Sequence, residues 1–337
     1  VLDAEAYGAG AVFLVTDAVE GHVLPEHVSA TVYGNQYAGQ LGWDIVGLGD
    51  VNGDGYGDIA VGASEQDRSD YAWDPVFRSQ LFRIDGPVDI NNIGDALLML
   101  DAEERMTCTG SVLETMADQD GDGARELIVG SRCAGEVHLL SAGVAETQER
   151  GEAIAELIGP GGDSRFGHVF KAMDLDGDGV EEVVVGAPDK HGLHEGFVSV
   201  FAGPVAGTVW HGDADQTLTV QTSESLRGST LFGTGVGLGD LDGDGTPDLA
   251  VSSPSMSAHE NNPLDGAIFV YFGPMGSTQS VDEADVRISG YYREDEPDSA
   301  WRPEEEWDTN PVAGHWGVGG PVHAGTDLNG DGMQDLL

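Results

Sequence analysis

The chain has 337 residues, 40% of them hydrophobic, so it is long enough to bury a sizeable core. Its 60 acidic residues against 14 Lys and Arg give a formal net charge of −46, which excludes nucleic acid and anionic membranes as partners by charge repulsion. No run of about 18 apolar residues occurs, so no membrane span is predicted. The 51 glycines favour short strands and tight turns over long helices.

The predicted strands recur along the chain in a fixed order. In most units a segment with an aromatic or apolar residue followed by Gly comes first, then a short β-rich run, then a Gly-led strand, and fourth a strand of alternating polarity. The short runs are 59–62, 127–130, 183–186, 249–252 and 336–337. The strands that follow them are 79–83, 135–139, 196–200 and 266–270, with 10–14 at the start of the chain. The alternating strands are 28–32, 96–100, 153–157, 217–220 and 286–289. This pattern predicts an all-β fold.

A nine-residue loop precedes each short run. The five loops are 50–58, 118–126, 174–182, 240–248 and 327–335, and they align without gaps. Asp or Asn occupies positions 1, 3 and 5, an acid occupies position 9, and Gly occupies positions 4 and 6. Ordinary turns also favour Asp, Asn and Gly, but they tolerate other polar residues at the positions that are invariant here.

Oxygen atoms at this spacing suit calcium, which takes six to eight oxygen ligands in a tolerant geometry. The glycines allow the backbone to curl around the ion, and position 7 can supply a backbone carbonyl, because its side chain varies. Magnesium prefers rigid octahedral sites, and zinc prefers the His and Cys that the loops lack. A strand follows position 9, so these are not EF-hands, which close with Glu at position 12.

We therefore predict about five calcium ions. The predicted ligands are Asp50, Asn52, Asp54, Tyr56, Asp58, Asp118, Asp120, Asp122, Ala124, Glu126, Asp174, Asp176, Asp178, Val180, Glu182, Asp240, Asp242, Asp244, Thr246, Asp248, Asp327, Asn329, Asp331, Met333 and Asp335.

Four strands per unit, repeated along the chain, predict a β-propeller. The whole chain, 1–337, is expected to be one propeller domain. Its blade units are approximately 35–94, 95–158, 159–221, 222–290, and 291–337 together with 1–34. The last unit would be a composite blade that draws two strands from each terminus and closes a five-bladed ring. Two alternatives remain open: a truncated seven-bladed propeller, and a blade completed between neighbouring chains into a polymer.

These repeats resemble the FG-GAP repeat of integrin α-subunit propellers and their bacterial extracellular relatives. Phe166-Gly167 and Phe232-Gly233 match its "FG" element, and residues 186–188 match its "GAP" element. The resemblance implies a propeller whose calcium loops join strands one and two on one face. Integrin propellers have seven blades and keep the metal loop in only some of them, whereas five loops are present here.

Two further features bear on the fold and its partners. Cys108 and Cys133 lie near the paired ends of neighbouring strands, so a disulfide is predicted, with two unrelated buried thiols as the alternative. Aromatic residues stand in two long insertions, which are interpreted either as a partner face opposite the calcium loops or as solvated excursions between blades: Tyr71, Trp73, Trp301 and Trp307.

The function predicted from these features is that of a secreted or cell-surface calcium-binding propeller with a structural or adhesive role, and not an enzyme. Its partner would be a protein or a glycan at the cell surface, and self-assembly into a polymer is one version of this reading. A carbohydrate-binding propeller and a polysaccharide lyase or hydrolase are the alternatives. Because the chain begins with Val1 and shows no signal-peptide pattern, it is expected to be processed or part of something longer.

Overall fold

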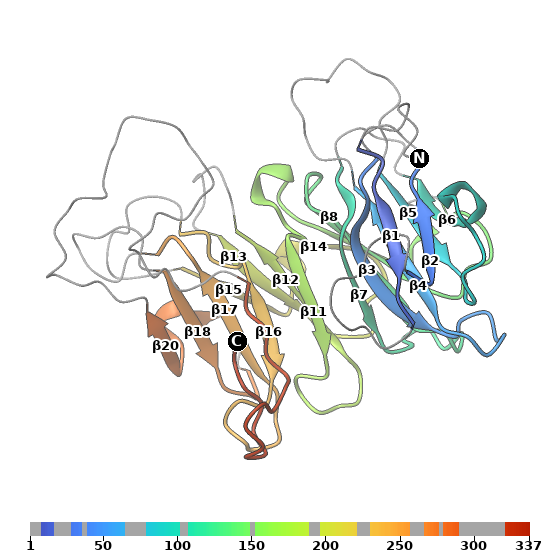
Figure 1. The fold of residues 1–337 in the computed structure, drawn as a ribbon. Helices are drawn as coiled ribbons and strands as arrows, with labels where there is room; N and C mark the ends of the chain where they lie inside the picture. Colours follow the sequence, from blue (N-terminus) through green and yellow to red (C-terminus); the bar gives the residue numbers. More distant parts are fainter. Residues whose placement is uncertain are drawn as a thin grey trace, which may run out of the picture. The chain divides into compact units, whose positions relative to one another are not determined.

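The fold is all-β, with strands joined by turns and short 3₁₀ segments (Figure 1). It was obtained as a computed structural model, which describes residues 8–16, 28–35, 39–64, 79–101, 107–148, 152–188, 196–220, 230–256, 266–275, 279–289 and 321–337. No α-helix occurs in these ranges, and hence no helix long and apolar enough to span a membrane. The partner-face residues Tyr71, Trp73, Trp301 and Trp307 lie outside the described residues.

The chain forms two compact units. The first comprises residues 1–172, 180–183 and 202–214, and the second comprises 173–179, 184–201 and 215–337. In the first unit, one antiparallel sheet holds four strands in chain order: β3 (Leu41–Gly49), β4 (Asp58–Ala63), β5 (Gln80–Ile84) and β6 (Leu97–Asp101). Branched apolar residues fill its middle strands, which are buried along most of their length.

A second sheet of the first unit repeats this plan. It holds β7 (Thr109–Met116), β8 (Glu126–Ser131), β9 (Glu136–Ser141) and β10 (Ala155–Ile158), and β14 (Gly207–Trp210) joins its outer edge. A core that includes Leu48, Leu81, Leu127 and Leu140 links this sheet to the preceding one. At the start of the chain, β1 (Ala11–Leu14) and β2 (Ala30–Tyr33) pair as a two-stranded sheet.

The second unit contains a sheet of the same plan. Its strands are β16 (Val236–Gly239), β17 (Asp248–Ser253), β18 (Ala267–Tyr271) and β20 (Val286–Ser289). The remaining sheet contains residues of both units and has the order β11 (Val169–Met173), β12 (Glu182–Ala187), β13 (Phe197–Phe201), β15 (Gln216–Thr219) and β19 (Gln279–Ser280). Successive four-stranded sheets confirm the predicted repeat and its strand positions.

Short parallel pairings cover the outer edges of several sheets. In each case the segment between strands three and four pairs with the outer strand of the preceding sheet. The pairs are Asn92 with Tyr33, Gln148 with Leu100, β14 with β10, and β19 with β15. Such covering satisfies edge N–H and C=O groups that would otherwise be open to pairing with another chain.

Glycines allow neighbouring sheets to approach backbone to backbone. A Cβ placed on Gly62 of β4 would lie 2.0 Å from the carbonyl oxygen of Gly110, which lies in β7 of the next sheet. A Cβ on Gly196 would likewise lie 2.3 Å from the carbonyl oxygen of Phe232. Gly62 and Gly196 are therefore packing positions, where any side chain would push against the backbone of a neighbouring sheet.

Each end of the chain forms a pair of antiparallel segments. The sheet β1–β2 corresponds to strands three and four of a unit. His323 and Leu337 exchange two backbone hydrogen bonds, and Thr326 bridges Asp335, so the C-terminal segment corresponds to strands one and two. The single-domain ring, the five-blade count and the composite blade stay predictions.

Candidate metal centres

Each predicted metal loop joins strand one to strand two of its sheet. Residues 50–58 connect β3 to β4, 118–126 connect β7 to β8, 174–182 connect β11 to β12, and 240–248 connect β16 to β17. Residues 327–335 turn within the C-terminal hairpin. The glycines at positions 4 and 6 all have positive φ angles, between 78° and 94°, so the backbone curls as the loop sequence predicts.

The aspartate at position 1 organises every loop. One of its carboxylate oxygens accepts from the N–H of position 4, with distances of 2.5–2.8 Å over the five loops. The other accepts from the N–H of position 6, at 2.8–3.0 Å. These bonds lower the pKa of Asp327 in the fifth loop, because they stabilise its charged form.

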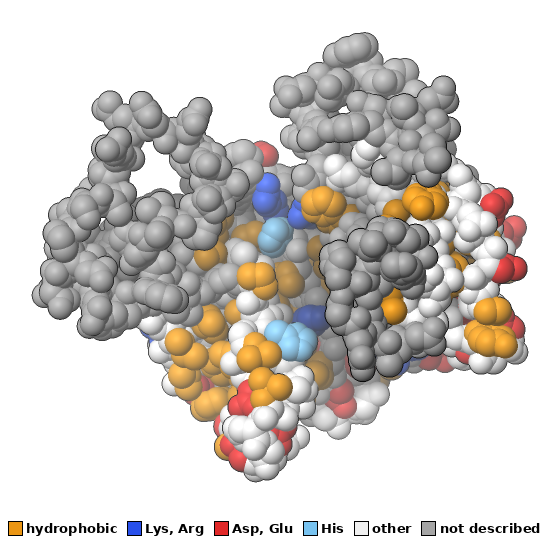
Figure 2. All heavy atoms as spheres, viewed as in Figure 1, with side chains coloured by type: hydrophobic (Ala, Val, Ile, Leu, Met, Phe, Trp, Pro, Cys, Tyr) orange, Lys and Arg blue, Asp and Glu red, His pale blue; other side chains and the backbone are white. Residues whose placement is uncertain are grey.

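The side-chain oxygens of positions 3 and 5 also lie within their own loop. The side-chain oxygen at position 3 accepts from the N–H of position 5 in all five loops, at 2.9–3.1 Å. In the second loop the carboxylates of Asp118, Asp120 and Asp122 place oxygens within 4.8 Å of one another. Asp240, Asp242 and Asp248 do the same in the fourth loop. Figure 2 shows acidic side chains gathered at the tip of the fourth and fifth loops, which are gold and red in Figure 1.

In the first four loops the acid at position 9 is buried, and in two of them it accepts hydrogen bonds from backbone N–H groups outside strand two, one in the loop and one after strand three. Asp248 accepts from Leu241 N at 2.7 Å and from Gly273 N at 2.9 Å, and Asp58 makes the equivalent bonds to Val51 and Gly86. Position 9 therefore ties the metal loop to the turn after strand three. That second role was not apparent from the spacing of the oxygens.

Electrostatics at position 9 favour a bound cation. Burial raises the pKa of Glu126. Backbone hydrogen bonds from Gln119 and Asp120 lower it, and the charges of Asp120 and Asp118 raise it, so that the net shift is upward. Burial likewise raises the pKa of Asp248. Glu126 Oε2 is buried and has no hydrogen-bond partner among the described residues. A divalent ion would supply both the missing partner and the missing positive charge, so the donor set of hard oxygens fits calcium.

Position 7 was predicted to use its backbone carbonyl. The large side chains there are exposed to solvent: Tyr56 is 55% exposed and Met333 is 38% exposed. The N–H of position 7 donates to the carboxylate of position 5 in four loops, at 2.7–2.9 Å. Carbonyl coordination by Tyr56, Ala124, Val180, Thr246 and Met333 stays a prediction.

Several residues that support the loops were not predicted from the sequence. Ser141 Oγ donates to Asp122 at 2.5 Å, and this bond is the main cause of the lowered pKa of Asp122. Gln119 Nε2 donates to the carbonyl of Glu181, whose carboxylate accepts from Ala117 N. Gln334 Oε1 accepts from Asp240 N at 2.9 Å. Positions 2 and 8 thus join neighbouring loops, a role that their variable side chains do not signal.

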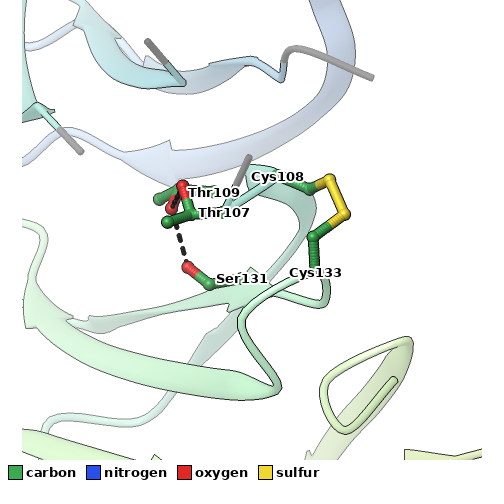
Figure 3. Close-up of a disulfide and its surroundings, with 5 residues drawn as sticks. All are labelled: Thr107, Cys108, Thr109, Ser131 and Cys133. Atoms are coloured by element: carbon green, nitrogen blue, oxygen red, sulfur yellow. Dashed lines mark hydrogen bonds between the residues drawn. A yellow bond between two sulfur atoms is a disulfide. The ribbon is translucent and has the colours of Figure 1, made fainter. Parts of the chain in front are cut away.

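A disulfide lies at the other end of the strands from the metal loop. Cys108 and Cys133 are bonded, with their Cα atoms 5.4 Å apart (Figure 3). Beside them Thr109 Oγ1 hydrogen-bonds Ser131 Oγ at 2.8 Å and Thr107 Oγ1 at 2.9 Å. The bridge therefore fastens the start of β7 to the turn that follows β8.

Comparison with known proteins agrees with these repeats. The FG-GAP repeat family matches residues 42–72 and 232–271. Integrin alpha-4 of Xenopus laevis is 34% identical over 112 residues, which is 33% of this chain and 10% of the integrin. Phosphatidylinositol-glycan-specific phospholipase D of Bos taurus is 36% identical over 116 residues, 33% of this chain and 13% of that protein. Integrin alpha-5 of Xenopus laevis is 26% identical over 181 residues, 52% of this chain and 14% of the integrin. The matched region is thus a small part of each relative.

Proposed function

Because the chain carries FG-GAP repeats on an all-β fold of four-stranded sheets, we propose that it is a calcium-stabilised, extracellular β-propeller with a structural or adhesive role. The observation that carries the proposal is the convergence of carboxylates in loops that hold the same backbone geometry five times. Similarity to two integrin alpha subunits supports an interaction role.

Calcium is proposed to act as a clamp between strands one and two. In each loop the ion would neutralise acids that otherwise repel one another. A ligand that binds only the folded state stabilises it by about 2.7 kcal/mol per site at a hundredfold excess over Kd. Five such loops make the metal a major contributor to stability.

The decisive measurement is thermal unfolding with calcium and with chelator, together with calorimetric counting of bound ions. We expect a large fall in melting temperature with EDTA and about five ions per chain. Asp240→Asn should remove about one ion from the count, while Asp163→Asn, at an exposed acid outside the loops, should remove none. An identical melt with and without EDTA would refute the calcium clamp.

The proposed ring has five blades, the last of which combines residues 1–34 with 291–337. The antiparallel pairing at each end of the chain supports it, because β1 and β2 match strands three and four of the repeat, while residues 321–337 match strands one and two. Closure within one chain predicts a monomer in calcium by sedimentation. Completion between chains predicts oligomers that grow with concentration and disappear when β1 and β2 are deleted.

An extracellular location is proposed from two features. The Cys108–Cys133 disulfide requires an oxidising compartment, and calcium loops are filled most readily where free calcium is abundant. Mass spectrometry of cysteines alkylated in the native state, with and without reductant, tests the first feature. Free thiols on the native protein would place it in a reducing compartment.

Binding, not catalysis, is the activity that we propose. The match to a phospholipase D concerns about an eighth of that protein, and the acids that converge here are those of the metal loops. Turnover assays on polysaccharides and on phosphatidylinositol-glycan lipids should show no activity in the fully purified protein. Turnover that is abolished by a single carboxylate substitution outside the loops would make the chain an enzyme.

A further inference from the structure

Three basic residues stand together at the end of the first unit's strands, away from the metal loops. Arg132 directly follows β8, Arg165 follows the 3₁₀ segment Gly162–Ser164, and His168 immediately precedes β11. The metal loops join the opposite ends of these strands. The cluster therefore belongs to the face on which a partner is expected.

Tight backbone packing holds these residues beside one another. A Cβ on Gly162 would lie 2.2 Å from the carbonyl oxygen of Cys133, and one on Gly135 would lie 2.6 Å from that of Gly161. The turn that carries Arg132 is thus pressed against the turn that carries Arg165. His168 N donates to the carbonyl of Arg165 at 2.9 Å. The disulfide also restrains the turn that carries Arg132, because the neighbouring residue Cys133 is bonded to Cys108.

The charges of this cluster are not balanced by the described part of the chain. Both arginines are half-buried, and neither has a carboxylate partner among the described residues. Burial lowers the pKa of Arg132, and the charge of Arg165 lowers it further. Arg83 provides a contrast, because that buried guanidinium bonds Asp85 and two carbonyls. Within the described ranges, two neighbouring arginines thus have no acidic partner, although acids outnumber bases 60 to 14 in the sequence.

An aromatic ring and a histidine nitrogen lie close to the arginines and could contact a ligand. The guanidinium carbon of Arg132 lies 5.7 Å from the centroid of the Trp43 ring, and Trp43 is 39% exposed. His168 Nδ1 is buried and has no hydrogen-bond partner among the described residues. Two positive charges that are half-buried side by side, as on Arg132 and Arg165, are unfavourable without a counter-ion. The two guanidinium groups are therefore arranged as in an anion-binding site whose anion is absent.

We propose that Arg132, Arg165 and Trp43 form a recognition site for a single carboxylate, presented by the acidic side chain of a protein partner. A guanidinium binds a carboxylate with two parallel hydrogen bonds, and Arg and Trp are the residues most enriched at the centre of protein interfaces. This inference rests on the interaction role proposed above and gives that role a chemical target.

The net charge decides between a single carboxylate and a polyanion. A polyanionic glycan would meet the repulsion of a chain with a net charge of −46 over its whole length. One carboxylate within a neutral segment meets only the local positive field, because charges farther than about 8 Å are screened at physiological salt. The site therefore fits an isolated Asp or Glu of a protein partner.

The test uses the calcium-loaded protein and a short peptide, Gly-Glu-Gly with acetylated and amidated ends. The control peptide carries Gln in place of Glu. Binding is followed by NMR through the ring signals of His168. We expect a saturable shift with the Glu peptide alone, weakened about tenfold or more by Arg132→Gln and by Arg165→Gln, as loss of a charged hydrogen bond predicts. Arg287→Gln is the matched control, because Arg287 also lies over an aromatic ring, 5.5 Å from the centroid of Phe269.

Three outcomes would overturn the proposal. They are equal shifts with the Gln peptide, shifts that neither arginine substitution alters, and tighter binding of glucuronate than of the Glu peptide. A fourth concerns the chain itself: if Arg165→Gln clearly lowers the melting temperature without any ligand, a carboxylate of this chain already fills the site. Failure of the calcium clamp would appear separately, as a melt unaffected by EDTA.

Discussion

At the scale of single residues, four non-glycine positions in the described part of the chain adopt the left-handed backbone conformation. Gln40, Cys108, Arg165 and Leu231 have φ angles between 51° and 54°. Each stands two residues before a glycine at the same place in its repeat, which is the "FG" glycine Gly167 or Gly233 in two of the four cases, so the repeat imposes the conformation. A non-glycine residue pays roughly 1–2 kcal/mol for it. Because the backbone is fixed there, the side chain is free to vary, and one copy carries the disulfide while another carries an arginine of the proposed carboxylate site.

His168 gives a prediction at the same scale. Burial, followed by the charges of Arg132 and Arg165, lowers the pKa of His168 from 6.5 to about 4. In the folded protein the imidazole stays neutral, while in the unfolded chain it takes up a proton as the pH falls below 6.5. His168 therefore reduces stability as the pH falls from 6.5 toward 4. Urea unfolding in excess calcium should show that His168→Gln loses less stability than wild type between pH 7 and pH 4.5.

The comparison for this prediction is another histidine of the first unit. His211, in the segment His211–Asp213, also has its pKa lowered by burial, but a nearby acid, Asp213, acts in the opposite direction. His211→Gln should change the acid sensitivity less than His168→Gln. Equal losses of stability in wild type and His168→Gln would mean that the imidazole is protonated in the folded protein.

At the scale of elements, the disulfide joins two turns that the sheet already brings together. It closes a loop of 25 residues, and a bridge of this span stabilises a fold by about 3 kcal/mol through the unfolded chain. Cys108→Ser with Cys133→Ser should lower the urea midpoint accordingly, with the calcium count unchanged, since the bridge lies at the other end of β7 and β8. A reductant should have the same effect on wild type and none on the double variant.

The glycine contact between sheets gives a second prediction for elements. Gly62→Ala would press a methyl group onto the carbonyl of Gly110, so we expect a loss of roughly 1–3 kcal/mol in unfolding experiments. Gly47→Ala is the control, because Gly47 lies in β3 of the same sheet and a Cβ there meets no atom within 4 Å. Equal effects of the two substitutions would show that the sheets can separate at little cost.

At the scale of the whole molecule, charge is the dominant property. Five calcium ions would neutralise less than a quarter of the net charge of −46. Self-repulsion therefore opposes folding, most strongly where the loops are without metal. In EDTA, the melting temperature should rise steeply with NaCl, because salt shortens the range of repulsion.

The slope of melting temperature against NaCl concentration, compared with and without calcium, shows whether the repulsion lies in the metal loops. With calcium bound, the same NaCl titration should raise the melting temperature less, since each ion then offsets two of the negative charges of its loop. Asp240→Asn should give a shallower slope than wild type in EDTA, whereas Asp163→Asn should not. Equal slopes with and without calcium would place the repulsion outside the loops.

The sequence by itself determined the repeated unit. Strand periodicity, loop spacing and paired glycines are local patterns, so they fix the strands, the order within each sheet and the candidate ligands of one loop without knowledge of distant contacts. The structure confirms the all-β fold and the four-stranded sheets. Only the tertiary structure showed which segments far apart in the sequence contact one another. Gln119, Gln334, Ser141, Arg132 and Arg165 bear no signature along the chain, because their roles depend on neighbours tens of residues away that packing alone brings beside them.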